Sequence, residues 1–268
     1  MEHRRLTALA VVCGMALLLG ADCVAAQTSD RMPAGFRIVS LALMDPHLFL
    51  RPHGCSDALS GDLSVNVQIN KQLNTDSDGD GNYDLSPVIA FQPLDPDAPG
   101  TTVELVFAGC TIPTQSPTVC SGAGAKRYRA AAVNMRTGEC LGVLTGTTNS
   151  TYVGKINTPS AGCFATDSQT IVISLAGIEL TLYDARIAAV YDGDPVAALT
   201  SGLIRGFVTE EDAEAVELKI PGAKSLAALL PGGRKNCARH SDQDICPGGA
   251  AGWYFYLNYT AVKTEWTE

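Results

Sequence analysis

The chain has 268 residues, of which 46% are hydrophobic and 18% are charged, and its formal net charge is −9 at pH 7. Such an acidic balance argues against nucleic acid or an anionic membrane surface as the partner. The length is sufficient to enclose one sizeable core, and a single all-β domain of this size is ordinary.

Residues 1–26 have the layout of a secretory signal peptide. A positively charged start is followed by an apolar run that ends near Gly20, and small residues lead up to Ala26. The run is too short for a permanent membrane span, and no later apolar stretch approaches the roughly 20 residues that cross a bilayer. We therefore expect a secreted or periplasmic protein, on the exterior side of the cell envelope. In the alternative, Cys23 anchors an envelope lipoprotein, although Asp22 stands where such a signal needs a small neutral residue.

The cysteines predict a disulfide framework. Removal of the signal segment leaves seven of the nine cysteines, and exported cysteines are more often bridged than reduced. Short spacings favour three local pairs, which leave Cys55 either as a buried free thiol or as the partner of a cysteine that spacing misassigns. The three pairs are Cys110 with Cys120, Cys140 with Cys163, and Cys237 with Cys246.

The first elements follow a short lead. We expect residues 27–35 to be flexible and residues 36–268 to form one β-rich domain. Residues 36–44 alternate apolar and polar side chains and predict a strand, and residues 47–51 predict a second one. Residues 63–73 fit both the strand period and the helical period, and we favour a helix there.

From residue 88 onward, short alternating runs recur between clusters of turn-forming residues. Many such runs predict a mostly β fold, an antiparallel β-sandwich or a barrel-like sheet with a few short helices, and an α+β fold is the alternative. No internal repeat of fixed period and no long linker interrupts the chain. The expected strands cover residues 88–94, 101–107, 127–135, 139–146, 169–175, 177–191 and 202–207.

The last quarter of the chain adds two helical signals and an aromatic strand. Thr209 is placed to cap a helix over residues 209–218, whose first turn is acidic. Residues 225–233 predict a second short helix that ends at a proline and glycines. Residues 252–262 carry large apolar or aromatic side chains at alternate positions on both faces. We expect that strand to be central or covered on both sides, since its aromatic side chains need packing partners.

The acidic stretch at residues 74–86, NTDSDGDGNYDLS, is the most specific motif. Aspartates occupy positions 1, 3, 5 and 9 of a D-x-D-x-D-G pattern, and a glycine occupies position 6. A chain that wraps around one ion points alternate side chains inward, and Ca²⁺ favours several carboxylates at flexible geometry. Four aspartates this close together also repel one another and need a counter-charge.

Over these positions the stretch resembles the calcium loops of EF-hand, dockerin and thrombospondin type 3 repeats. The resemblance implies a structural Ca²⁺ ion bound by residues 76–84. Position 12, which is acidic in EF-hands and dockerins, is Pro87 here, so a further carboxylate such as Asp95 or Asp97 is expected to complete the site. Pro87 also predicts a strand instead of a second helix, which excludes the paired opening of a calcium sensor. The implied ligands are the side chains of Asp76, Asp78, Asp80 and Asp84 and the main-chain carbonyl of Asn82.

The same loop, together with the segments LIRGFVTEEDAEA, SLAALLPGG and GWYFYLNYTAV, is similar to secreted bacterial proteins with no assigned activity. The function expected from these features is a secreted, calcium-stabilised, β-rich binding or structural module. Its partner would be an extracellular or cell-surface ligand. Nucleic acid is not expected as a partner, because the chain is acidic.

An enzyme is the less favoured reading of the sequence. The chain contains no G-x-S-x-G, H-E-x-x-H or P-loop motif, which are signatures of common hydrolases and nucleotide-binding proteins. The alternative is an extracellular hydrolase that uses His240, Asp242 and Asp244, which stand at alternate positions in one loop. His47 and His53 would join this group only if the fold brings them to it.

Overall fold

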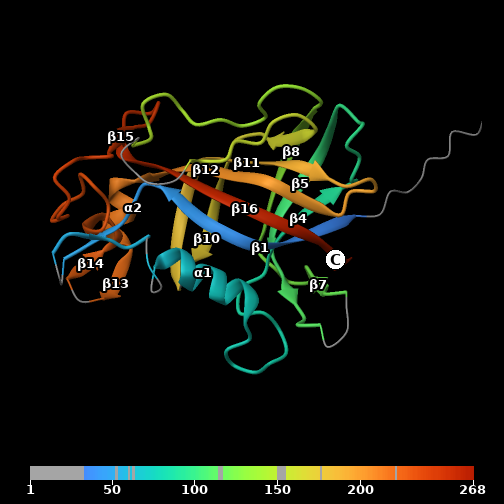
Figure 1. Cartoon of the computed structure of the whole chain (residues 1–268), viewed down its shortest axis with the longest axis horizontal. Helices are drawn as coiled ribbons and strands as arrows, with labels where there is room; N and C mark the ends of the chain where they lie inside the picture. Colours follow the sequence, from blue (N-terminus) through green and yellow to red (C-terminus); the bar gives the residue numbers. More distant parts are fainter. Residues whose placement is uncertain are drawn as a thin grey trace, which may run out of the picture. The chain divides into compact units, whose positions relative to one another are not determined.

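Eight antiparallel strands close into a β-barrel in the computed structural model, which confirms the mostly β fold expected from the sequence (Figure 1). The structure describes residues 33–51, 54–59, 61, 64–113, 117–149, 155–175, 177–220 and 222–268. In their order around the barrel, the strands are β1 (Ala34–Asp45), β4 (Pro87–Gln92), β5 (Gly100–Phe107), β8 (Arg127–Met135), β9 (Cys163–Thr166), β11 (Ile178–Asp192), β12 (Ala198–Thr209) and β16 (Ala251–Thr267). Pairing of β16 with β1 closes the barrel.

Shorter elements extend the barrel sheet and flank it. The further strands are β2 (Phe49–Leu50), β3 (Ser56–Asp57), β6 (Gly109–Cys110), β7 (Val119–Ser121), β10 (Gln169–Leu175), β13 (Glu217–Ile220), β14 (Ala223–Ser225) and β15 (Asp244–Ile245). The helical segments are α1 (Val65–Asn74), α2 (Glu210–Ala215) and the 3-10 turn η1 (Leu226–Ala228). The hairpin of β6 and β7 joins the end of β16 in parallel, whereas β2 with β3 and β13 with β14 form separate two-stranded sheets.

Strand β16 is central to the barrel, as its aromatic composition predicts. It pairs with β1 along one edge and with β12 along the other. Trp253, Phe255 and Leu257 point into the main core. Tyr254 and Tyr256, on the opposite face, belong to a second buried cluster. Both faces of β16 are therefore covered, because its alternate side chains pack in two different hydrophobic clusters.

The strand predicted over residues 139–146 is wrong. This segment forms no strand and makes only an isolated bridge between Glu139 and Ser160. Leu141 instead packs in the cluster of Tyr256, and the Leu144 N–H donates a hydrogen bond to the Tyr256 hydroxyl (3.0 Å). The apolar residues of the segment cover an aromatic face of β16, which local alternation cannot distinguish from strand pairing.

The helical predictions are partly confirmed. Helix α1 forms in the predicted segment and extends one residue beyond it, to Asn74, and the Thr209 hydroxyl caps α2 by accepting a hydrogen bond from the Asp212 N–H (3.0 Å). Helix α2 is shorter than predicted, because the chain turns into β13 at Glu217. The second predicted helix is reduced to the single turn η1.

At the start of the chain, β1 begins inside the segment predicted to be flexible. The predicted signal peptide, which includes Cys23, and residues 27–32 lie outside the described residues. Within the residues that the structure describes, no helix is both long enough and apolar enough to cross a membrane.

Three disulfides join cysteines of the described residues, and two of them are the predicted pairs Cys110–Cys120 and Cys140–Cys163. The pair of Cys237 with Cys246 is wrong. Cys237 instead bonds Cys55 across a sequence separation of 182, and Cys246 is the free cysteine among the described residues. Sequence spacing cannot reveal this bond, because only the fold brings the two segments together. The disulfides are compatible with an oxidising compartment outside the cytoplasm.

Candidate metal centre

Three asparagines fasten helix α1 to an open edge of β1. That edge pairs with β4 only over Ala34–Arg37, so within the described residues the rest of it has no neighbouring strand. The asparagines stand four residues apart and therefore share one helical face, where their amides bond the strand's main chain. The bonds join Asn66 to the N–H and C=O of Leu43 (2.8 and 3.0 Å), Asn70 to those of Leu41 (3.2 and 2.7 Å), and Asn74 to the C=O of Val39 (3.1 Å). The amides thus replace a strand and fix the position of the helix.

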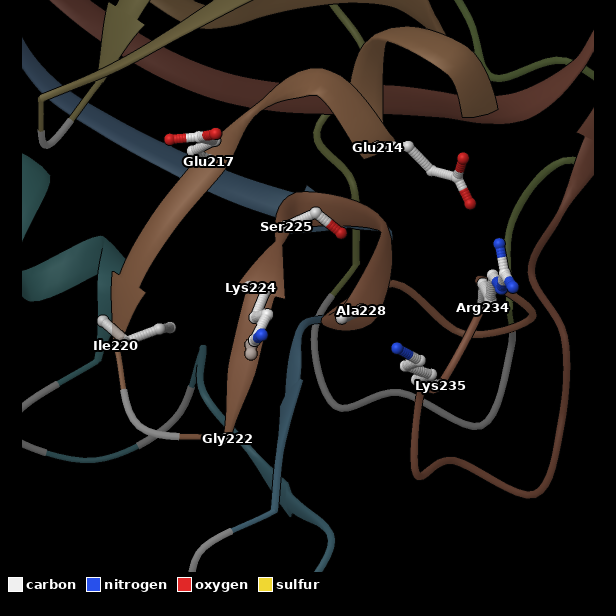
Figure 2. Close-up of a pocket in the computed structure, with 10 residues that line it drawn as sticks. Glu214, Glu217, Ile220, Gly222, Lys224, Ser225, Ala228, Arg234 and Lys235 are labelled. Carbon is white, nitrogen blue, oxygen red and sulfur yellow. The ribbon is translucent and has the colours of Figure 1, made fainter.

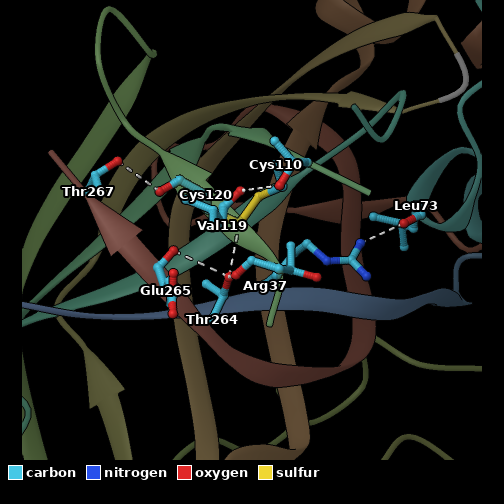
Figure 3. The surroundings of a disulfide bond; sticks show 10 residues. Arg37, Leu73, Cys110, Val119, Cys120, Thr264, Glu265 and Thr267 are labelled. Carbon is cyan, nitrogen blue, oxygen red and sulfur yellow. Dashed lines mark hydrogen bonds between the residues drawn. A yellow bond between two sulfur atoms is a disulfide. The ribbon is translucent and has the colours of Figure 1, made fainter. Parts of the chain in front are cut away.

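A buried arginine holds the last turn of α1. Arg37, only 5% exposed, donates a hydrogen bond from Nη1 to the carbonyl of Leu73 (2.6 Å; Figure 3). Its guanidinium also lies over the ring of Tyr83, 3.9 Å from the ring centre. Burial lowers the pKa of Arg37 from its ordinary value, and Tyr83 opposes that shift. Arg37 therefore links the end of the helix to the far end of the acidic loop.

The acidic loop folds around the carboxylate of Asp76. This carboxylate accepts hydrogen bonds from the main-chain N–H groups of Gly79 (2.6 Å), Asp80 (3.2 Å) and Gly81 (2.8 Å). Gly79 and Gly81 have φ angles of 78° and 87°, in the left-handed region that favours glycine. The two glycines of the motif thus let the chain turn around the first aspartate.

Asp84 brings the end of the loop back to its start. Its carboxylate accepts hydrogen bonds from the N–H and the hydroxyl of Ser77 (2.8 and 2.6 Å) and from the hydroxyl of Thr75 (3.3 Å). One oxygen each from Asp76, Asp78 and Asp84 lie within 4.8 Å of one another. The loop therefore gathers three carboxylates on one side.

Main-chain donors keep two of these carboxylates ionised. The Gly81 N–H has the largest effect in lowering the pKa of Asp76, and the Ser77 N–H has the largest effect in lowering that of Asp84. Protonation at neutral pH therefore does not relieve the repulsion between them. A cation is the remaining way to neutralise the group, apart from solvent.

The disulfide-bonded hairpin of β6 and β7 supports the loop from the other side. The Tyr83 N–H donates to the carbonyl of Cys110 (3.0 Å), and the Ile112 N–H donates to the carbonyl of Gly81 (2.9 Å). Cys110 and Cys120 are fully buried, and Figure 3 shows their disulfide beside the end of β16. The loop is thus attached both to α1 and to a covalently closed hairpin.

The structure brings together three of the five predicted ligands. Asp76, Asp78 and Asp84 form the group. Asp80 lies outside that group, and its carboxylate accepts a hydrogen bond from the Asn82 N–H (2.7 Å). Asn82, predicted to contribute its carbonyl, forms an isolated bridge with the β6–β7 hairpin.

The residues suggested to complete the site lie elsewhere. Asp97 forms an ion pair with Arg136 (3.1 Å), and the carbonyl of Asp95 accepts a hydrogen bond from Asn134 (2.8 Å). Neither belongs to the group of three carboxylates found in the described part of the chain. Pro87 begins β4 as predicted, so the loop connects a helix to a strand.

Two residues of the alternative hydrolase site, Asp242 and Asp244, line a polar cavity of about 220 Å³. His240 Nε2 is 3.8 Å from Asp242 Oδ2, and Asp242 accepts a hydrogen bond from Asn149 (2.8 Å). Asp244 accepts one from the Tyr254 N–H (3.2 Å), and burial raises the pKa of Asp244. His47 contacts Asp57 through Nδ1 (2.6 Å), and His53 lies outside the described residues.

Asp45 adds a buried carboxyl group at this end of the barrel. It is 3% exposed, and its Oδ1 has no hydrogen-bond partner in the described part of the chain. Burial, together with the charges of Asp242 and Asp244, raises the pKa of Asp45 to about 8, against the effect of a hydrogen bond from the Asn149 N–H. Asp45 is therefore mostly protonated at neutral pH. No signal in the sequence indicated that Asp45, which precedes a proline, would be buried and protonated.

No family model matches the sequence, and no curated protein or solved structure is detectably similar to the chain. The resemblance of the acidic loop to known calcium loops therefore stays a prediction. The geometry of the loop and its supports is what remains to indicate a role.

Proposed function

We propose that this protein is a calcium-stabilised β-barrel that acts outside the cytoplasm as a binding or structural module. The observation that carries this proposal is the group of Asp76, Asp78 and Asp84, whose oxygens lie within 4.8 Å of one another. The group stands in a loop that joins α1, β4 and the β6–β7 hairpin.

The donor chemistry of the loop fits Ca²⁺. Calcium takes six to eight oxygen ligands at about 2.3–2.6 Å, from carboxylates, main-chain carbonyls and water. Asp76, Asp78 and Asp84 would hold the ion, and water would fill positions that the loop leaves open. Asp76 already accepts three main-chain hydrogen bonds, but a carboxylate has about four lone-pair sites and can still bind a cation.

The proposed role of the ion is to stabilise the fold. An ion that binds only the folded state adds stability by mass action, about 2.7 kcal/mol at a concentration one hundred times its dissociation constant. Extracellular calcium near millimolar fills even a site with a dissociation constant of about 10⁻⁴ M. The loop would then hold the helix, the strand and the hairpin in one arrangement.

Thermal unfolding after chelation, followed by titration with calcium or magnesium, tests this proposal. We expect calcium at saturation to raise the midpoint by about 5 °C, because roughly 2 kcal/mol shifts a domain of this size by that amount. Magnesium should do less, since it demands a stricter octahedral geometry.

Asp78→Asn is the sharpest variant for this test. The Asp78 carboxylate accepts a long main-chain hydrogen bond from the Asp80 N–H (3.2 Å), and an amide oxygen can accept the same bond, so the substitution removes a charge while preserving the loop. We expect it to weaken calcium binding about tenfold or more, since a neutral oxygen replaces an anionic ligand. Asp194→Asn, an exposed aspartate at the β11–β12 turn, is the control for charge. A midpoint that calcium does not raise in the parent protein would remove the proposal.

A further inference from the structure

An open cavity of about 690 Å³ lies beside the small sheet of β13 and β14, away from the acidic loop (Figure 2). Its walls come from α2, β13, β14, η1 and the segment that follows η1. Volumes of about 300–1,000 Å³ are typical of sites for small molecules. The cavity is therefore large enough for a ligand of about the size of a phosphorylated aromatic ring.

The cavity stands in a basic part of an acidic protein. Residues 217–239 contain five basic residues and one acidic residue, whereas the whole chain has a net charge of −9. Three of these basic side chains, Lys224, Arg234 and Lys235, line the cavity. A local concentration of positive charge on an acidic background attracts anionic ligands to that place.

The three cations have no charged partner. Lys224, Arg234 and Lys235 make no side-chain hydrogen bond or ion pair within the described ranges. In Figure 2, Lys235 extends toward Ala228 and Lys224, and Arg234 lies on the side of Glu214. Their donors are thus available to an incoming oxyanion.

The wall that carries Arg234 and Lys235 is fixed in place. Lys235 has a φ of 68°, a left-handed conformation that is uncommon for lysine and is frequent at functional sites. Arg51 donates a hydrogen bond to the Lys235 carbonyl (3.1 Å), and Asn236 donates one to the Ala228 carbonyl (3.1 Å). The disulfide Cys55–Cys237 ties the same segment to the chain near Arg51. Such preorganisation lowers the entropy cost of binding a ligand.

We propose that this cavity binds a small phosphate monoester. The proposal rests on the role of a binding module and names the class of its ligand. Arg234 presents a planar fork that suits phosphate oxygens, and the two lysines add point charges that favour a dianion. The apolar side chains of Ile220 and Ala223 line the same cavity and give the organic group a surface to contact.

The acidic residues of the cavity set the polarity of the ligand. Glu214 and Glu217 come from α2 and β13, whereas the cations come from β14 and the segment after η1. Figure 2 shows the glutamates above the two lysines. If a ligand carried an anionic group at each end, its second group would be repelled by the glutamates. The ligand should therefore be negatively charged at one end only.

Titration calorimetry with phenyl phosphate, and with benzoate as a matched ring that carries one negative charge, tests the site. We expect phenyl phosphate to bind the parent protein at least about tenfold more tightly than benzoate, because each added charge-assisted contact is worth about that factor. The double variant Arg234→Gln with Lys235→Gln should weaken phenyl phosphate binding about tenfold or more on the same basis. Its control, Lys155→Gln with Lys263→Gln, removes the same charge from exposed positions outside the cavity and should bind like the parent.

Absence of phenyl phosphate binding to the parent would overturn this inference, as would equal losses in the cavity variant and its control. Benzoate that binds as tightly as phenyl phosphate would overturn the choice of a phosphate. The titrations are made on chelated, folded protein, and calcium-dependent unfolding is recorded on the same preparation. If calcium raises the unfolding midpoint but phenyl phosphate does not bind, only this inference is wrong. If phenyl phosphate binds but calcium does not raise the midpoint, only the calcium proposal is wrong.

Discussion

Asp45 couples the stability of the barrel to pH at the scale of one residue. Its carboxyl is buried at the end of β1, and its pKa rises from an ordinary value of 3.8 to about 8. A group with a raised pKa binds more protons in the folded state than in the unfolded state. Its contribution to the free energy of unfolding is therefore complete below pH 3.8 and is lost as pH rises toward 8.

We predict that Asp45→Asn removes this loss. The amide oxygen can still accept the hydrogen bond from the Asn149 N–H, and no proton is released on unfolding. Between pH 4 and pH 8, the free energy of unfolding of the variant minus that of the parent should increase by on the order of 1 kcal/mol per pH unit. Urea unfolding at pH 4, 6 and 8.5 measures the difference.

Asp192→Asn, at an exposed position at the end of β11, is the control for that measurement. Curves of stability against pH that run parallel for parent and Asp45→Asn would contradict the prediction, because they would show an ordinary carboxyl at position 45.

At the scale of elements, helix α1 stands where a strand would otherwise pair with β1. The amides of Asn66, Asn70 and Asn74 satisfy main-chain groups at alternate residues of that edge. Polar groups left without partners beside a core cost about 1–3 kcal/mol each. The position of the acidic loop, which directly follows α1, therefore depends on the hydrogen bonds that hold α1 against β1.

We predict that Asn70→Leu lowers the free energy of unfolding by about 2 kcal/mol, because it leaves the N–H and C=O of Leu41 without their partner. Gln68→Leu, at an exposed position of the same helix, is the matched control and should change stability by less than about 0.5 kcal/mol. Denaturant unfolding of both variants measures these changes. Similar decreases in the free energy of unfolding of the two variants would contradict the proposed role of the Asn70 amide.

Local signals made several elements predictable. The helical period of α1 and the two-sided aromatic pattern of β16 depend on neighbours in sequence, and both elements were predicted, although the α1 segment fits the strand period as well. The strand predicted over residues 139–146 was wrong, because residues that pack over Tyr256 and residues that pair in a sheet have the same apolar pattern. In the candidate site, spacing located Asp76, Asp78 and Asp84, but it could not show that Asp80 turns to the Asn82 N–H.

At the scale of the whole molecule, features that join distant parts of the sequence were not predictable. The bond between Cys55 and Cys237 spans 182 positions, and no local pattern marks it. Closure of the barrel by β1 and β16 is of the same kind. Alternation predicts that strands exist, whereas the order of strands depends on the complete core.

We predict that Cys55→Ser with Cys237→Ser lowers the free energy of unfolding by up to about 5 kcal/mol. A crosslink that closes so long a loop removes much of the entropy of the unfolded chain, and Cys55 is exposed, so little core packing is lost with it. Cys246→Ser, which removes a thiol that is in no disulfide, should change stability by less than about 1 kcal/mol. Guanidinium unfolding without reductant gives both values, and a double variant as stable as the parent would contradict the loop-closure explanation.

The pairing of β1 with β16 also sets the order in which the chain can fold. Strand β1 is made early and β16 near the end of the described chain, yet β1 pairs with β16 from Gly35 to Asp45. Until β16 has been synthesised and released, β1 presents open main-chain groups that can recruit other strands, a known cause of aggregation. Completion of the barrel must therefore await emergence of β16, so a nascent chain needs protection of β1 for most of its synthesis.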